Sequence, residues 1–144
     1  MSLYIDTSCL LKLFFPERDS SAVAELVGAE DQVVVSTLAH LELHVQVQGR
    51  VAGGTLSARA ATTLMALVDR TLGQLPYEVA ETPSNLFVIA SRQITPMGRA
   101  VHCRTLDRLH LAAMEALSLR RLLTSDEIQA RAALARGFEV VRLK

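Results

Sequence analysis

Two aspartates stand directly after short apolar segments that are typical of buried β-strands. Asp6 follows LYI near the start of the chain, and Asp126 follows RLLTS near its end. Ligands of open parallel sheets bind outside the carboxyl ends of the strands, so we expect both carboxylates at one site. Each aspartate also has a simpler explanation, because Asp is a favoured helix N-cap and suits the positive helix end. Gln129 even gives Asp126 the spacing of a capping box. The two aspartates alone therefore leave a capping role and a functional role open.

Two further carboxylates fall on the apolar sides of segments with helical periodicity. Glu42 lies among the apolar positions of the segment 37–50, and Asp107 lies beside those of the segment 105–119. In the first segment we expect a buried stripe of Leu38, Leu41 and Val45. In the second segment we expect a stripe of Leu106, Leu109, Ala113, Met114 and Leu117. An inward carboxylate needs a cation, a metal ion or several hydrogen bonds, and neither stripe contains a Lys or Arg.

The four carboxylates together indicate a metal site. If Asp6, Glu42, Asp107 and Asp126 converge in one cleft, they repel one another and would be partly protonated without a cation. Oxygen ligands suit Mg²⁺ or Mn²⁺ better than Zn²⁺. A divalent cation held there can activate water and offset the charge that develops on a phosphate. The pattern therefore predicts metal-dependent phosphodiester hydrolysis.

The elements that must position these residues alternate between strands and helices. The 144 residues, half of them apolar, fit a single domain over 1–144. The expected strands are 2–5, 32–36, 77–81, 121–125 and 138–143. The expected helices are 7–15, 20–28, 37–50, 56–73, 83–94, 105–119 and 127–137, with a loop over 95–103. This alternation predicts an α/β fold with a central parallel sheet of four or five strands covered on both faces.

The composition narrows the classes of partner. Lys+Arg and Asp+Glu both number 15, so the net charge is zero, which argues against a polybasic nucleic-acid clamp. Cys9 and Cys103 fit neither a disulfide framework nor a metal spacing, which is typical of a reducing compartment. The chain shows no leader segment and no run of about 18 apolar residues. We therefore expect a soluble cytoplasmic protein with no membrane partner.

Four segments, in this order, resemble the PIN-domain ribonucleases, and in particular the VapC-type toxins of toxin–antitoxin pairs. They are YIDTSCLLKLFFPE, VVVSTLAHLEL, TLDRLHLAAMEAL and LLTSDEIQARAALARGFEVV. The resemblance implies a PIN-like three-layer α/β/α fold, Mg²⁺- or Mn²⁺-dependent endoribonuclease activity on RNA, and inhibition by a cognate antitoxin. It also implies that the catalytic and metal-binding acids are Asp6, Glu42, Asp107 and Asp126, supported by the hydroxyls of Thr7, Ser8 and Ser125.

Several other residues have two explanations each. Arg104 and Arg108 either lie on a solvated face with Glu115 or contact phosphate near the metal. For His110, a satisfied buried histidine that orients a neighbour is favoured over a general base or ligand. His40 and His44 flank Glu42 along its helix and should lie at the surface. The apolar helix within 56–73 is core, or it serves a homodimer or an antitoxin helix.

Other enzyme classes fit less well. A haloacid-dehalogenase-type phosphatase needs a second Asp where this chain has Ser8, and a receiver domain needs a phosphoacceptor Asp in mid-chain and a late Lys that are not in place. The Rossmann and P-loop glycine patterns are absent. A PIN nuclease of RNA processing or decay, and a non-catalytic binding module with an inert acidic pocket, remain as alternatives. Metal-dependent cleavage of RNA would separate the enzymes from the binding module.

Overall fold

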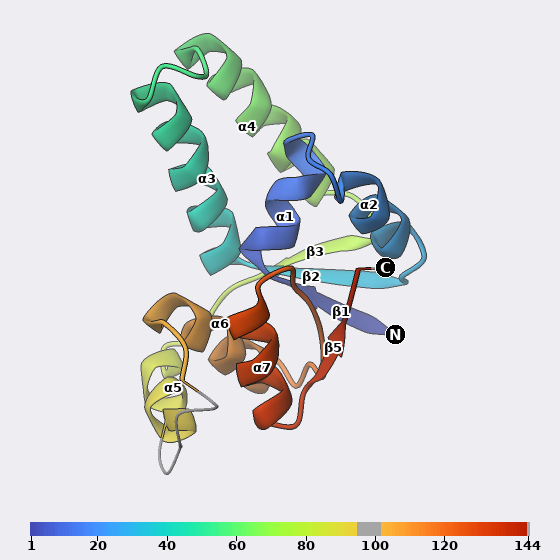
Figure 1. Ribbon diagram of the computed structural model, residues 1–144, viewed down its shortest axis with the longest axis vertical. Helices are drawn as coiled ribbons and strands as arrows, with labels where there is room; N and C mark the ends of the chain where they lie inside the picture. Colours follow the sequence, from blue (N-terminus) through green and yellow to red (C-terminus); the bar gives the residue numbers. More distant parts are fainter. Residues whose placement is uncertain (95–101, 144) are drawn as a thin grey trace.

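The chain folds around one parallel five-stranded sheet. The computed structural model describes residues 1–94 and 102–143. The strands are β1 (Ser2–Ile5), β2 (Gln32–Ser36), β3 (Tyr77–Ala80), β4 (Arg121–Leu123) and β5 (Glu139–Val141), in the order β3-β2-β1-β4-β5 (Figure 1). Every neighbouring pair is parallel. This arrangement confirms the predicted α/β class and parallel sheet.

Helices cover both faces of the sheet, which gives three layers (Figure 1). One face packs against α1 (Thr7–Phe14), α2 (Ser20–Gly28), α3 (Thr37–Ala52) and α4 (Ala58–Leu72). The other packs against α5 (Leu86–Ile94), α6 (Thr105–Ala116) and α7 (Glu127–Ala135). The strands serve two cores because successive side chains point to opposite faces. Leu3 and Ile5 enter the first core, whereas Tyr4 between them enters the second.

The direction of winding reverses at β1. From β1 the chain moves outward to β2 and β3 through α1–α4, and it then crosses back through α5 and α6 to β4, on the other side of β1. The backbone N–H of Asp6 still donates to the carbonyl of Leu123 at 3.2 Å, so the ends of β1 and β4 lie side by side. Such a reversal point is where open α/β sheets bind their ligands.

Most predicted elements are present within one to three residues of their expected ends. The predicted loop 95–103 lies outside the described residues over 95–101. In the part of the chain that the structure describes, no helix is long and apolar enough to cross a membrane.

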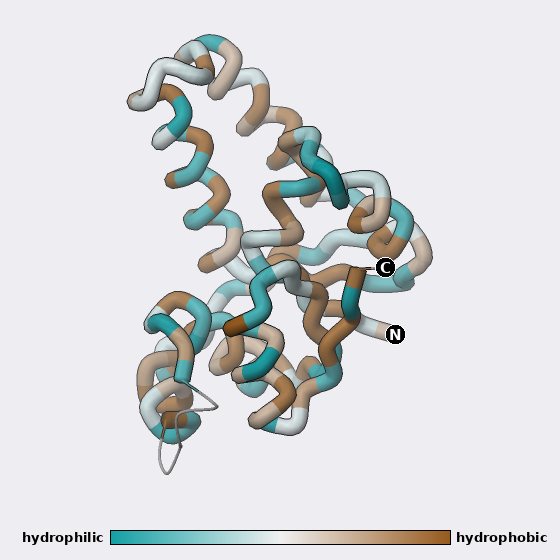
Figure 2. The backbone as a smooth tube through the Cα atoms, viewed as in Figure 1, coloured by the Kyte–Doolittle hydropathy of each residue, from teal (hydrophilic) through white to brown (hydrophobic). Residues whose placement is uncertain are grey.

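The buried face of α3 differs from the predicted one. The fully buried side chains are Ala39, Leu43 and Val47, whereas Leu41 is 58% exposed and Val45 is 60% exposed. The expected stripe was therefore wrong for Leu41 and Val45. Both sides of this helix carry apolar residues, visible as brown bands alternating with teal in Figure 2, so periodicity alone did not fix its rotation. Contacts with α1, α4 and the sheet bury the row of Ala39, Leu43 and Val47 instead.

This rotation predicts unequal costs for two leucine truncations on α3. Leu43→Ala should lower the free energy of unfolding by about 2–5 kcal/mol, because it leaves a cavity in the core. Leu41→Ala should change it by no more than about 0.5 kcal/mol, because that side chain is already in solvent. Urea unfolding followed by circular dichroism measures both. Equal losses in the two variants would contradict the observed rotation of α3.

Candidate active site

Asp6 is buried at the adjacent ends of β1 and β4, and it caps α1. Its Oδ1 accepts from the backbone N–H of Cys9 at 3.2 Å and from the hydroxyl of Ser8 at 2.6 Å. Its Oδ2 accepts from the hydroxyl of Thr124, just beyond β4. Burial raises the pKa of Asp6, even though the hydrogen bonds from Ser8 and Thr124 favour its charged form. Asp6 thereby connects the start of α1 with the loop after β4, which is far from it in the sequence.

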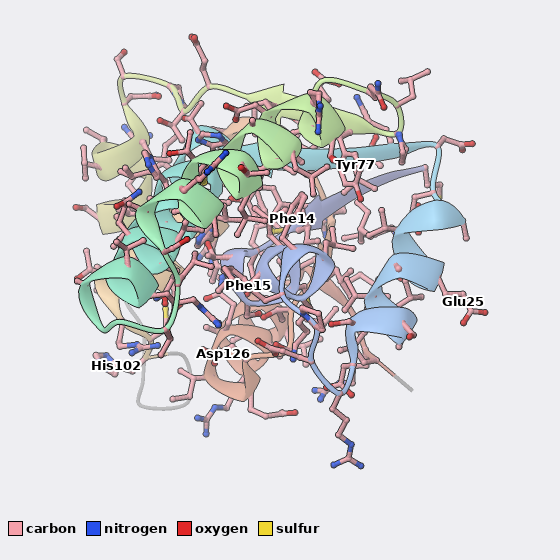
Figure 3. The ribbon with its side chains drawn as sticks, turned by 90° about the horizontal axis from the view of Figure 1, so that it is seen from above. Phe14, Phe15, Glu25, Tyr77, His102 and Asp126 are labelled. Carbon is pink, nitrogen blue, oxygen red and sulfur yellow. The ribbon has the colours of Figure 1, made fainter. Side chains whose placement is uncertain are left out.

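Asp126 caps α7 with only one of its two oxygens. Its Oδ1 accepts from the backbone N–H groups of Ile128 at 2.9 Å and Gln129 at 3.1 Å. Its Oδ2 lies 3.8 Å from the Nη2 atom of Arg104. Figure 3 labels Asp126 at the start of α7. The Gln129 side chain does not close a capping box, because it donates to the backbone carbonyl of Asp107 at 3.2 Å. The capping explanation is therefore correct for Asp126, and it leaves one carboxylate oxygen for other contacts.

Asp107 lies in the first turn of α6 with an unsatisfied oxygen. Its Oδ2 is buried and has no hydrogen-bond partner among residues 1–94 and 102–143, and it lies 3.7 Å from Nε of Arg104. Burial raises the pKa of Asp107, and the negative charge of Asp126 raises it further. A buried carboxylate oxygen without a partner costs stability, so this position favours binding of a cation.

Glu42 turns toward the other acids despite the unexpected rotation of α3. Its Oε1 accepts from the hydroxyl of Thr7 at 2.9 Å and lies 2.5 Å from Nε2 of His110. Burial alone would raise the pKa of Glu42, but the hydrogen bond and charge of His110 outweigh it and hold that pKa below its ordinary value. The hydroxyl of Tyr4 lies 2.6 Å from Nδ1 of His110. His110 is thus a buried histidine with both ring nitrogens engaged, as the favoured interpretation predicted.

Electrostatic interactions link the four acids. The charge of His110 acts on Asp6, Glu42 and Asp107, and Asp107 also interacts with Asp126. Within residues 1–94 and 102–143, however, no three His, Cys, Asp or Glu side chains lie close enough together to hold a metal ion. The predicted metal-binding set therefore stays a prediction.

The chemistry of the donors nevertheless fits a hard divalent cation. Every acidic donor is a carboxylate oxygen, which suits Mg²⁺ or Mn²⁺. Oδ2 of Asp107 accepts no hydrogen bond from any described residue, and the α7 cap does not use Oδ2 of Asp126. These two oxygens, with those of Asp6 and Glu42, are the groups that would hold the ion.

Hydroxyl groups donate to two of the acids, Glu42 and Asp6. Thr7 donates to Glu42, Ser8 donates to Asp6, and the N–H of Ser125 donates to Oγ of Ser8 at 3.1 Å. Thr124 was not among the predicted site residues, yet its hydroxyl donates to Asp6 and accepts from the N–H of Asp126 at 3.0 Å. Its place in the segment LLTSD, next to Ser125, was the available signal.

The two candidate phosphate-binding arginines differ in exposure. The side chain of Arg104 is 79% exposed and lies near both Asp107 and Asp126. Arg108 is only 5% exposed, and its Nη1 donates to Oε1 of Gln93 on α5 at 3.4 Å. The expectation of a solvated face was therefore wrong for Arg108, because α5 packs over that side of α6. Leu106, expected in the buried stripe, is instead 48% exposed.

Comparison with known proteins identifies the family. The PIN domain model matches residues 3–134, so this chain belongs to the PIN-domain family. A comparison with curated protein sequences finds no match.

Solved structures show the same fold. The Mycobacterium tuberculosis toxin VapC20, described as cleaving the sarcin–ricin loop, has a TM-score of 0.71 at 18% identity, over 97% of this chain and 98% of that one. VapBC2 from Rickettsia felis, bound to a promoter DNA fragment, has a TM-score of 0.69 at 12% identity, and the match covers 98% of both chains. A toxin–antitoxin complex from Klebsiella pneumoniae has a TM-score of 0.64 at 17% identity, and the match covers 100% of this chain and 98% of that one. The PIN-like fold that the sequence predicts is confirmed.

Replacing Asp107 with Asn should stabilise the metal-free protein at neutral pH. The folded-state pKa of Asp107 is raised, so folding disfavours its charged form. That penalty is complete above the folded-state pKa and disappears below the unfolded value of about 3.9. In EDTA, Asp107→Asn should melt at or above the wild-type temperature near pH 7, and the difference should shrink as the pH falls toward about 4.

Thermal melting in EDTA over a pH series measures this effect. Asp31→Asn is the matched control, because a hydrogen bond from the N-terminal ammonium group lowers the pKa of exposed Asp31. This control should gain no stability at pH 7. A melting temperature of Asp107→Asn far below wild type would indicate that Asp107 has a structural role instead.

Proposed function

We propose that this chain is a metal-dependent endoribonuclease, the toxin of a toxin–antitoxin pair, acting as a single PIN domain in the cytoplasm. The observation that carries the proposal is the buried Oδ2 of Asp107, which accepts no hydrogen bond from the described part of the chain, at the acidic carboxyl edge of a PIN-family sheet. An oxygen in that state is costly unless a ligand binds it. The toxins among the structures of the same fold support RNA as the substrate class.

The four acids have complementary roles in this proposal. Asp6 and Glu42 are held in place by hydrogen bonds from Ser8, Thr124, Thr7 and His110. Asp107 and Asp126 provide the less constrained oxygens. A bound Mg²⁺ or Mn²⁺ would supply positive charge that favours hydroxide formation and offsets charge on the phosphate. Thr7 and Ser8 keep the carboxylates of Glu42 and Asp6 oriented, and the N–H of Ser125 holds Ser8. The ligand set is therefore positioned before the substrate arrives.

Substrate contact in a neutral protein must come from local cations. The net charge is zero, so long-range attraction of RNA is weak. The exposed guanidinium of Arg104, beside Asp107 and Asp126, is the proposed phosphate contact. Arg108 is buried and is not included.

The toxin assignment is favoured over a PIN nuclease of RNA processing or decay because of the partners in the compared structures. The Klebsiella pneumoniae structure is described as a toxin–antitoxin complex, and VapC20 is described as a toxin. This chain also exposes apolar side chains on its helices, among them Leu41 and Val45 on α3, Leu67 on α4, and Phe87 and Val88 on α5. Such surface is suited to an antitoxin helix and to a homodimer.

Cleavage of RNA by the purified chain tests the activity. With Mn²⁺ or Mg²⁺ the wild type should cut RNA, and EDTA should abolish cutting. Asp126→Asn should fold normally, because Asn caps about as well as Asp. It should still lose activity on the order of 100-fold, because a charge needed at the site is removed.

The control for this variant is Asp69→Asn. Asp69 lies on α4, where it pairs with His40 at 2.8 Å, outside the acidic edge. The activity of the Asp69→Asn variant should match that of the wild type. Cleavage that survives both EDTA and Asp126→Asn would refute the proposal, and a wild type that binds RNA without cutting it would support the non-catalytic module.

Co-purification and molecular mass test the proposed antitoxin partner and the dimer. The chain produced together with a small gene from its own operon should co-purify with that product, and the chain alone should be dimeric at micromolar concentration. Size-exclusion chromatography with light scattering reports both masses. A monomer that retains no operon partner would remove this part of the proposal.

A further inference from the structure

A buried row of polar side chains runs from the sheet to Glu42. The hydroxyls of Ser36 and Tyr4 are 2.9 Å apart, the Tyr4 hydroxyl lies 2.6 Å from Nδ1 of His110, and Nε2 of His110 lies 2.5 Å from Oε1 of Glu42. Tyr4 and Ser36 are fully buried, and His110 is almost fully buried. The row therefore links the ends of β1 and β2 with α6 and α3.

The hydrogen bond between His110 and Glu42 can have only one donor. An ionised carboxylate only accepts hydrogen bonds, so Nε2 of His110 must carry the hydrogen. This holds whether the Tyr4 hydroxyl donates to Nδ1 or accepts from it. A His110 with Nε2–H facing Glu42 is not free to take a proton from water at that nitrogen. Its geometry thus fits a donor to Glu42 better than a general base.

Two contacts with Tyr4 restrict the orientation of the His110 imidazole. The Tyr4 ring packs edge-on against it, with ring centroids 5.8 Å apart and an interplanar angle of 71°. The Tyr4 hydroxyl adds the hydrogen bond to Nδ1, which restricts rotation of the ring. Tyr4 is in turn held by Ser36, whose Oγ also accepts from the N–H of Ala39 as the cap of α3.

We infer that His110 is a positioning residue for Glu42, with Tyr4 and Ser36 as its anchor. Both described donors to Glu42, Thr7 and His110, bind Oε1. That arrangement leaves Oε2 for a ligand and sets the direction in which it points. The inference rests on the proposed function, because the ligand that Oε2 would meet is the divalent cation of the nuclease site.

Two substitutions of His110 distinguish the roles of its two ring nitrogens. His110→Gln places an amide donor near the former position of Nε2, so it can still donate to Glu42. His110→Asn is shorter and can reach only toward Tyr4. Measured by calorimetric titration of the full chain with Mn²⁺, His110→Asn should weaken binding by about 10–100-fold, the usual effect of losing a residue that orients a ligand. His110→Gln should restore much of that loss.

A double-mutant cycle tests whether the effect passes through Glu42. In a Glu42→Gln background, His110→Asn should cause no further loss of Mn²⁺ affinity, because the carboxylate that it positions is gone. Tyr4→Phe keeps the ring and removes the hydroxyl, so it should weaken Mn²⁺ binding several-fold in the wild type and not in the Glu42→Gln chain. Melting curves in EDTA show which variants are folded.

The outcomes distinguish this inference from the proposed function. Unchanged Mn²⁺ affinity in His110→Asn, or equal losses with and without Glu42, would overturn the positioning role alone. If His110→Asn does not fold, unchanged Mn²⁺ affinity in Tyr4→Phe overturns it in the same way. A folded wild-type chain that binds no Mn²⁺ and cuts no RNA refutes the proposed function itself, and the positioning role with it.

Discussion

Burial of the Asp6 carboxylate is the constraint on which the arrangement of the site depends. A charged group out of water must be surrounded by hydrogen-bond donors. Those donors come from the start of α1, through Ser8 and Cys9, and from the loop after β4, through Thr124. Because these segments are more than a hundred residues apart in the sequence, satisfying Asp6 fixes the ends of β1 and β4 side by side. The chain reverses its winding at the same place, so the burial cost falls where a ligand site is expected.

Helix capping at Asp126 leaves one carboxylate oxygen for a ligand. A helix N-cap needs one carboxylate oxygen, and Asp126 uses only Oδ1 for the N–H groups of α7. Its second oxygen shares the exposed Arg104 with Asp107. Exposed ion pairs at such distances contribute little stability, so Arg104 leaves most of the repulsion between the two acids unrelieved. The raised pKa of Asp107 follows from its burial together with that repulsion.

The sequence was informative where local pattern decides structure and uninformative where contacts between distant segments decide it. Strand-end positions predicted Asp6 and Asp126 because strand ends are marked by short apolar runs. Glu42 was singled out with an incorrect rotation of α3, because that helix has apolar residues on more than one side. Tyr4 and Ser36 were not foreseen as part of the site. A tyrosine in a short apolar strand is typical of core, and its partner His110 lies 106 positions away.

The site also requires both helical layers to be in place. Glu42 and Thr7 come from helices that pack on one face of the sheet, whereas Asp107, His110 and Asp126 come from helices on the other. Neither set could assemble alone, since Glu42 is oriented by His110 across the sheet edge and Asp6 is satisfied by Thr124 from beyond β4. Buried polar contacts of this kind tolerate little misalignment, because a partner lost in a low-dielectric interior is costly. Packing of α6 against Tyr4 therefore controls the geometry of a carboxylate on α3, and the stability of the second core becomes part of the chemistry of the site.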